Sequence, residues 1–391
     1  MNTNETFKFK LFYFIRFLGD GFFYPFMSIY FIQKGMSEDN LGIILAITPI
    51  TTILVNPLWN YLVKDSKVSR IVLQVMTVIE GILIILITKV TGFELIALLI
   101  GLIAFFCSPY VSIQDGFTAT YCNKNKVEYS SIRIYASIAY VIATLIAGYL
   151  GSYFGYDVLF FVAGLFFGLT ALINIWIKPI ESKSTSQEQL PKRDFKSLLQ
   201  NKDFYKYLIF YVIVIGAVRI GDSFFGVYIT GDLGITSIGY GWVYAAFVLV
   251  EVIVLRFMTV RGNLYKEKNL MIIATSTFLL RFLIYFIEAP VEVVILATLL
   301  RGVAWGIVLY VHIKYVINIV KLENVTTAIL IITLLFSIFT GVGNYLTGSF
   351  VRVNGYPLLY LILAGLILLG FISFLVFTPK LRSSETVIQN K

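Results

Sequence analysis

The stretch "LYLILAGLILLGFISFLVF" at residues 359–377 is apolar on every side of a helix. A helix on the surface of a soluble protein has one polar face, whereas a helix surrounded by lipid is apolar all round. The whole chain has this character, because 58% of its 391 residues are hydrophobic and only 14% are charged. Its mean hydropathy of +0.86 leaves too little polar surface to cover a soluble globule. The sequence therefore predicts a protein embedded in a bilayer.

Apolar runs of similar length recur along nearly the whole chain, and each is long enough to cross about 30 Å of hydrocarbon as a helix. Strands of a membrane barrel would alternate apolar and polar residues over about ten positions, and these runs do not alternate. We therefore predict an all-α integral membrane protein with twelve transmembrane helices. The predicted spans lie near residues 9–33, 41–63, 70–89, 93–117, 132–153, 156–178, 205–230, 238–259, 269–288, 291–317, 325–350 and 356–378.

The basic residues are distributed unevenly between the predicted loops. A net charge of +9 would suggest a nucleic-acid partner in a soluble protein, but here most lysines and arginines fall in loops on one side of the predicted membrane. The opposite loops hold few of them, chiefly Lys34, Lys89 and Arg352. Cytoplasmic loops are enriched in Lys and Arg. We therefore expect a multi-pass protein of the cytoplasmic (inner) membrane, with both termini in the cytoplasm and no nucleic-acid partner.

A short sequence motif near the start of the chain is repeated near its middle. "RFLGDGFFYPF" (16–26) begins the first half, "RIGDSFF" (219–225) begins the second, and the basic, Ser- and Gln-rich segment 179–204 separates them as a cytoplasmic linker. Six spans lie on each side, so both copies have the same orientation. Parallel repeats of this kind relate the two halves of major facilitator transporters, whose substrate site lies between them.

These features predict two pseudo-symmetric six-helix bundles arranged as in the major facilitator fold. The predicted parts are an N-terminal bundle at 1–178, the linker at 179–204, a C-terminal bundle at 205–378 and a cytoplasmic tail at 379–391. We expect a monomer that interacts with the lipid bilayer and a small-molecule substrate.

Charged residues inside the predicted spans are the candidates for function. On a helix, Arg16 and Asp20 share a face at i+4, and Arg219 and Asp222 share one at i+3, so that each pair can neutralise itself. A charge at mid-membrane costs about 2.5–3.5 kcal/mol on insertion scales, so such residues line a bundle interior or a wet cavity. We expect Arg16 and Asp20 to contribute to a substrate site. The alternative is that these pairs only hold helices together.

Five further charges lie deep in spans from both halves, and we expect them to line one central cavity. They are Asp115, Arg133, Glu251, Arg281 and Arg301. Bidentate arginine and carboxylate groups would orient a polar solute there. Glu80 lies mid-span with no partner that the sequence assigns. His312, the one histidine of the chain, lies near a cytoplasmic end, where anchoring is its default role and proton carriage the alternative.

Two stretches resemble the lactose permease group of the major facilitator superfamily, which contains oligosaccharide:proton symporters and nucleoside-permease-like relatives. "EDNLGIILAITPITTILVNPLWNYLVKDSKVSR" (38–70) is similar to the second span and its following loop. "SIQDGFTATYCNKNKVEYSSIRIYASIAY" (112–140) is similar to the fourth-to-fifth span region, where a carboxylate and an arginine eighteen residues apart bind the sugar. Asp115 and Arg133 reproduce that interval. The resemblance also implies that Tyr140 and Ser137 lie beside the substrate.

The second half carries a weaker likeness with clear departures. "LLRFLIYFIEAPVEVVIL" (279–296) is similar to the family's ninth span, which implies a proton-coupling role for Arg281. The family's tenth-span proton relay is not preserved, because its positions align with Ala297, Leu300 and Val303. The coupling candidates are therefore the carboxylates Glu251 and Asp222 and the arginines Arg281 and Arg301.

Together these observations predict a secondary transporter that moves a saccharide or nucleoside-like solute by alternating access. We expect proton-coupled symport with no cofactor other than the proton as coupling ion, and no metal. The alternative within the same fold is a drug or metabolite efflux antiporter, against which the fifth span "ASIAYVIATLIAGYLGSYFGY" counts because it has no proline. An intramembrane aspartyl protease is a remote alternative, because neither "FLGD" nor "RIGD" has the first glycine of the protease motif.

Overall fold

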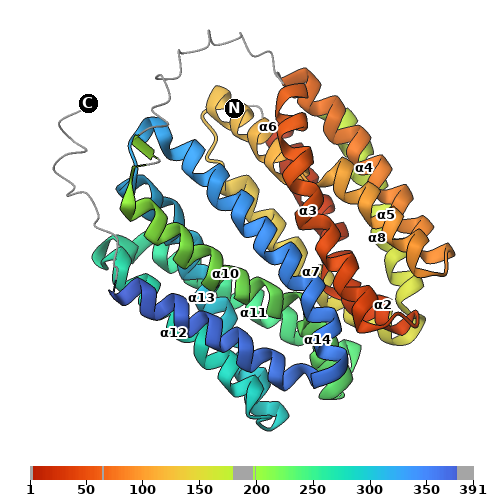
Figure 1. The fold of residues 1–391 in the computed structure, drawn as a ribbon. Helices are drawn as coiled ribbons and strands as arrows, with labels where there is room; N and C mark the ends of the chain where they lie inside the picture. The colour runs from red at the N-terminus through yellow and green to blue at the C-terminus, as the bar shows by residue number, and fades with distance from the viewer. Residues whose placement is uncertain (1–2, 64–65, 179–196, 199, 377–391) are drawn as a thin grey trace. The chain divides into compact units, whose positions relative to one another are not determined.

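The computed structural model describes residues 3–63, 66–178, 197–198 and 200–376. Most of the predicted linker at 179–204 and all of the predicted tail at 379–391 lie outside the described residues. Within those described ranges the regular structure is helical, with no strand (Figure 1).

The helices of the first half end at or before residue 176. They are α1 (Thr3–Phe23), the short 3₁₀ turn η1 (Tyr24–Phe26), α2 (Met27–Gln33), α3 (Glu38–Leu62), α4 (Ser66–Lys89), α5 (Phe93–Cys107), α6 (Tyr110–Asn125), α7 (Ser130–Phe154) and α8 (Tyr156–Trp176). Those of the second half begin at residue 202. They are α10 (Lys202–Val227), the π-helical turn η2 (Tyr228–Asp232), α11 (Ser237–Arg261), η3 (Gly262–Leu264), α12 (Glu267–Phe286), α13 (Val291–Ile319), η4 (Leu322–Asn324) and α14 (Val325–Val376).

Ten helical stretches of the described chain are long and apolar enough to cross a membrane. The last of them, Leu322–Val376, contains two crossings, because Gly355 has a left-handed φ of 76° that interrupts α14. The more charged segment Thr3–Gln33 adds one crossing at the start. Across the described residues this makes the twelve transmembrane helices that the sequence predicts.

Proline explains two other interruptions. Pro25 lies in η1, between α1 and α2, within the predicted first span. Pro109 precedes α6 directly, so the fourth crossing consists of α5 and α6 rather than one helix. A proline has no backbone N–H to donate, so it is favoured at the first turn of a helix, although α3 accommodates Pro49 and Pro57 in its interior. The helix α6 continues past the predicted end of this span at residue 117, to Asn125.

The chain divides into two compact units, each assembled from three stretches. Unit 1 comprises Met1–Ser186, Ser223–Val248 and Asn344–Arg352. Unit 2 comprises Gln187–Asp222, Leu249–Gly343 and Val353–Lys391. The bundle boundaries expected from the sequence, 1–178 and 205–378, stay a prediction.

In unit 1, α1 packs against α7 and α8. The helix α4 packs against α5, α6 and α8, and Figure 1 shows α4, α5 and α8 side by side. The contact between α4 and α8 depends on glycine. A Cβ on Gly164 would lie 2.8 Å from the carbonyl oxygen of Gly81, so the two backbones meet without side chains between them. This close approach brings α4, with its charged Glu80, directly beside α8. In unit 2, α12 and α13 pack against each other.

Candidate functional site

The first polar site is a buried cluster in unit 1 formed by Arg16, Asp20 and Glu80, called the Arg16 cluster below. Arg16 Nη1 lies 3.0 Å from Asp20 Oδ1 one turn further along α1. Arg16 Nη2 lies 3.0 Å from Glu80 Oε2 on α4. Arg16 is 2% exposed, Asp20 5% and Glu80 0%. The guanidinium therefore bridges two carboxylates in the interior of the unit.

Aromatic residues complete this environment. The rings of Tyr110 and Phe167 lie 4.2 and 4.3 Å from the guanidinium carbon of Arg16, which places the cation over two ring faces. The Tyr24 hydroxyl donates to Glu80 Oε1 at 3.1 Å. Neither Arg16 nor Asp20 is open to a solute in this arrangement.

The second site in unit 1 joins α1, α6 and α7 and is called the Asp115 site. Arg133 Nε lies 3.9 Å from Asp115 Oδ1, and Tyr13 donates its hydroxyl proton to the same oxygen at 2.7 Å. The side chains of Asp115 and Arg133 are 36% and 35% exposed. This long, half-exposed ion pair leaves hydrogen-bonding capacity on both groups for a solute.

Aromatic and hydroxyl groups surround the ion pair. The ring of Phe17 lies 4.7 Å from the guanidinium carbon of Arg133 and stacks on Tyr13 one turn away. Ser137 and Tyr140 follow Arg133 at i+4 and i+7 on α7, so they share its face, and both are half-buried. Arg133, Ser137 and Tyr140 thus share one face of α7, with Asp115 beside Arg133, and their contact with the substrate stays a prediction.

Three members of the Asp115 site were missed by sequence reasoning. Tyr13 and Phe17 are two among many aromatics of the first span, and only their i, i+4 spacing next to Arg16 could have singled them out. Tyr129 lies just before α7 and bonds to Asp115. Partial burial, together with the neighbouring Asp115 charge, raises the pKa of Tyr129 to about 12. The phenol therefore keeps its proton near neutral pH and remains a donor.

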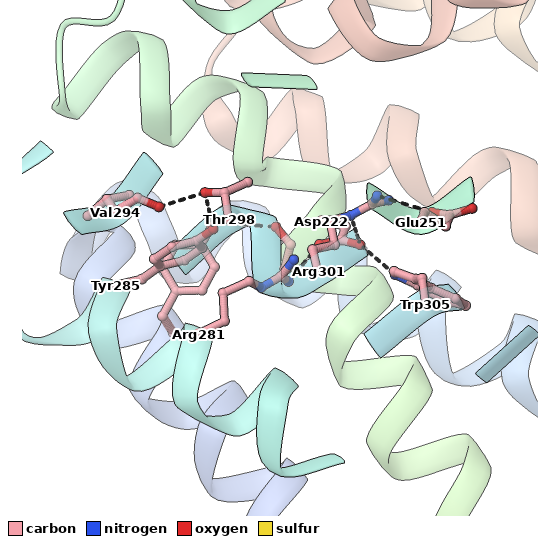
Figure 2. Close-up of polar contacts among 10 residues, drawn as sticks. Asp222, Glu251, Arg281, Tyr285, Val294, Thr298, Arg301 and Trp305 are labelled. Atoms are coloured by element: carbon pink, nitrogen blue, oxygen red, sulfur yellow. Dashed lines mark hydrogen bonds and ion pairs between the residues drawn. The ribbon is translucent and has the colours of Figure 1, made fainter. Parts of the chain in front are cut away.

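Unit 2 holds the third site, centred on Asp222 near the end of α10 (Figure 2). Arg281 Nη2 on α12 donates to Asp222 Oδ1 at 2.7 Å, and Arg301 Nε on α13 donates to Asp222 Oδ2 at 2.8 Å. Trp305, one turn after Arg301, donates its indole N–H to the same Oδ2 at 3.3 Å. One carboxylate thus receives donors from two arginines and a tryptophan.

Glu251 on α11 is more loosely attached to this site, which we call the Asp222 cluster together with Arg281, Arg301 and Trp305. Its Oε2 lies 3.9 Å from Arg301 Nη1, and its side chain is 26% exposed (Figure 2). Asp222 is 7% exposed and tightly bonded. Of the two carboxylates, Glu251 is therefore the one that can gain or lose a proton with less disturbance.

The structure assigns partners that the sequence did not. Glu80, unplaced by the sequence, faces Arg16 across the α1–α4 contact. Both oxygens of Asp222 are bonded to arginines from α12 and α13, which the sequence did not pair with it. The carboxylates of the repeated motif, Asp20 and Asp222, thus have different partners in the two halves. His312 Nδ1 shares a hydrogen bond with the Tyr207 hydroxyl at 2.9 Å.

Comparison with known proteins shows the family to which the chain belongs. The model of the MFS_1 like family matches residues 6–362. The chain belongs to that family, and with it to the major facilitator superfamily. It is 23% identical to the maltose permease of Geobacillus stearothermophilus, over 90% of this chain and 87% of the permease. It is 24% identical to the uncharacterized transporter YwbF of Bacillus subtilis (strain 168), over 86% of this chain and 83% of that one.

A solved structure supports the fold. The crystal structure of a mutant of the nucleoside transporter NupG superposes with a TM-score of 0.84 at 16% identity, covering 96% of this chain and all of the NupG chain. The protein is therefore a multi-pass membrane transporter with the major facilitator fold. Its relatives are transporters, not enzymes, which removes the aspartyl protease alternative.

Proposed function

We propose that this transporter carries a saccharide or nucleoside-like solute by alternating access and couples its movement to protons. The Asp115 site would hold the solute, and the Asp222 cluster would bind and release the proton. The observation that carries the proposal is the half-exposed Asp115–Arg133 pair, whose atoms lie 3.9 Å apart beside Phe17. Hydroxyl-rich solutes need donors, acceptors and an apolar ring face together, and this site offers all three.

Two of the similar proteins support the same class of solute. A maltose permease and a nucleoside transporter are both similar to this chain, and each name describes a polar solute with several hydroxyl groups. The proposal includes a monomer in the cytoplasmic membrane with both termini inside, as the loop charges predict. Glu251 is the candidate proton carrier because it combines a loose ion pair with partial exposure.

A thermal-shift screen of the purified protein against saccharides and nucleosides tests the solute class. We expect at least one of them to raise the unfolding temperature in a saturable way. Asp115→Asn should lower the affinity for that solute by about 10- to 100-fold, because a hydrogen bond to a charged group contributes roughly 1.5–3 kcal/mol. Tyr13→Phe should lower the affinity less, because the Tyr13 phenol acts through Asp115 by positioning its carboxylate.

Glu94→Gln is the matched control, because Glu94 is an exposed carboxylate in the first turn of α5. It should leave the solute affinity unchanged. A stabilising solute that binds wild type and Asp115→Asn equally would move the binding site away from Asp115. A panel without any stabilising member would contradict the proposed solute class.

A further inference from the structure

The Arg16 cluster has an unequal number of opposite charges. Its two carboxylates, Asp20 and Glu80, face one guanidinium, and all three side chains are at least nine-tenths buried. With every group ionised, the cluster would carry a net negative charge out of contact with water. A buried charge without compensation is strongly disfavoured, and a carboxylate in that position takes up a proton.

The contacts show which carboxylate is less compensated. Glu80 Oε1 accepts hydrogen bonds from Arg16 Nη2 at 3.3 Å and from the Tyr24 hydroxyl at 3.1 Å, and Glu80 Oε2 lies 3.0 Å from Arg16 Nη2 without hydrogen-bond geometry. Asp20 receives Arg16 Nη1 at 3.0 Å, without hydrogen-bond geometry. The negative charge is therefore better supported on Glu80 than on Asp20.

Other titratable groups around the two carboxylates do not remove the imbalance. The neighbours from the packed helices are Tyr24, Cys107 of α5, Tyr110 of α6, and Arg133 and Tyr140 of α7. The phenols and the thiol are neutral near pH 7. The Arg133 guanidinium lies beside Asp115 and thus balances a different carboxylate. On α8 the neighbour is the uncharged ring of Phe167.

A metal cation fits this position poorly. The guanidinium of Arg16 already lies 3.0 Å from an oxygen of each carboxylate. A sodium-like or divalent cation needs several oxygen ligands at closer range and would be repelled by the adjacent positive charge. A proton needs one oxygen and little space.

We propose that Asp20 is a proton-binding site of this transporter, separate from the Asp222 cluster of unit 2. A proton from a hydronium ion in the surrounding water binds one oxygen of the Asp20 carboxylate and leaves it as a neutral carboxylic acid. The proton returns to water when the site opens. The use of this proton in transport rests on the proposed function, whereas its binding does not.

Infrared spectroscopy of the purified full-length protein in phosphatidylethanolamine–phosphatidylglycerol vesicles tests the site without any solute. At about pH 7 an exposed carboxyl is ionised. The wild type should show the C=O stretch of a protonated carboxylic acid, with a shift in D₂O. The variants below are compared in a Glu251→Gln background, so that this other candidate proton carrier contributes no band. Asp20→Asn should lose this band completely. Glu80→Gln should lose it too, because Asp20 then stays ionised beside Arg16. Glu94→Gln should keep it.

Each other result overturns the proposal. A wild-type protein without the band has no protonated carboxyl at this pH. A band that persists in Asp20→Asn belongs to another residue, and one that persists in Glu80→Gln does not arise from the excess of carboxylates. Because Asp20→Asn resembles the proposed neutral state, it should keep the wild-type unfolding temperature, and failure to fold would also contradict the proposal. A solute screen that finds no ligand would leave the infrared result unaffected.

Discussion

Arg16 Nη2 and Glu80 Oε2 lie 3.0 Å apart in the interior of unit 1, although the two residues are separated by 64 positions. The contact links α1 to α4, and Gly81 and Gly164 allow α4 to pack closely against α8 beside it. At this depth water cannot solvate either charge if the ion pair is broken. Its members should therefore matter more for stability than any pair at the surface.

Arg16→Met tests that expectation. The variant leaves Asp20 and Glu80 buried without their cation, so we expect a loss of about 3–5 kcal/mol in the free energy of unfolding. Both carboxylates must then be protonated to stay buried, so the loss should grow as pH rises and ionisation is favoured. Thermal unfolding in detergent at several pH values measures both effects. The control is Arg352→Met, which removes a 59% exposed partner of Asp39 and should cost about 0–1 kcal/mol. Equal losses in the two variants would contradict the burial argument.

Asp222→Asn should destabilise unit 2, because it leaves arginines, rather than carboxylates, without a counter-ion. Arg281 and Arg301 would lose the carboxylate that both contact at 2.7 and 2.8 Å, at a cost of about 3–5 kcal/mol. Adding Arg281→Met should recover part of that loss, because Arg301 would still have Glu251 nearby. The unfolding temperatures of Asp222→Asn, Arg281→Met and the double variant measure the coupling between the two residues. A double variant whose loss equals the sum of the single losses would show no coupling between the two residues.

Glu251→Gln should separate coupling from solute movement. In vesicles containing the purified transporter, the variant should no longer accumulate the solute found in the thermal-shift screen against its gradient, while solute exchange should continue at the wild-type rate. The reason is that the amide cannot carry a proton, whereas its shape preserves the packing. Glu292→Gln, at an exposed carboxylate in the first turn of α13, is the control. Full accumulation by Glu251→Gln would remove Glu251 from the coupling mechanism.

Gly164→Ala tests the α4–α8 contact. The new Cβ would lie 2.5 Å from Ile85 Cγ1 and 2.8 Å from the Gly81 carbonyl oxygen, so the helices must move apart at a cost of about 1–3 kcal/mol. Gly168→Ala, one turn later on α8, meets nothing within 4 Å and should instead stabilise the helix by up to about 1 kcal/mol. Unfolding temperatures compare the two. If Gly164→Ala is as stable as Gly168→Ala, the glycines do not determine how close the helices lie.

Much of the candidate site was predictable because the charges of this chain stand out against hydrocarbon. Asp115 and Arg133 are recognisable as charges within predicted spans, and the resemblance to the lactose permease group implies that they act together. The i+4 pair of Arg16 and Asp20 follows from helix geometry alone. Tyr13, Phe17 and Trp305 were not recognisable, because aromatic residues occur throughout the chain and packing does not distinguish them from ligand contacts.

The sequence by itself determined the membrane-embedded helical class, the number of crossings and the repeat, because length and polarity decide whether a helix is stable in lipid. Only the tertiary structure decided which charges meet. Glu80 faces Arg16 and Asp222 receives Arg281 and Arg301 because helix packing brings distant positions together. Helical periodicity specifies which residues share a face, but not which neighbouring helix that face contacts.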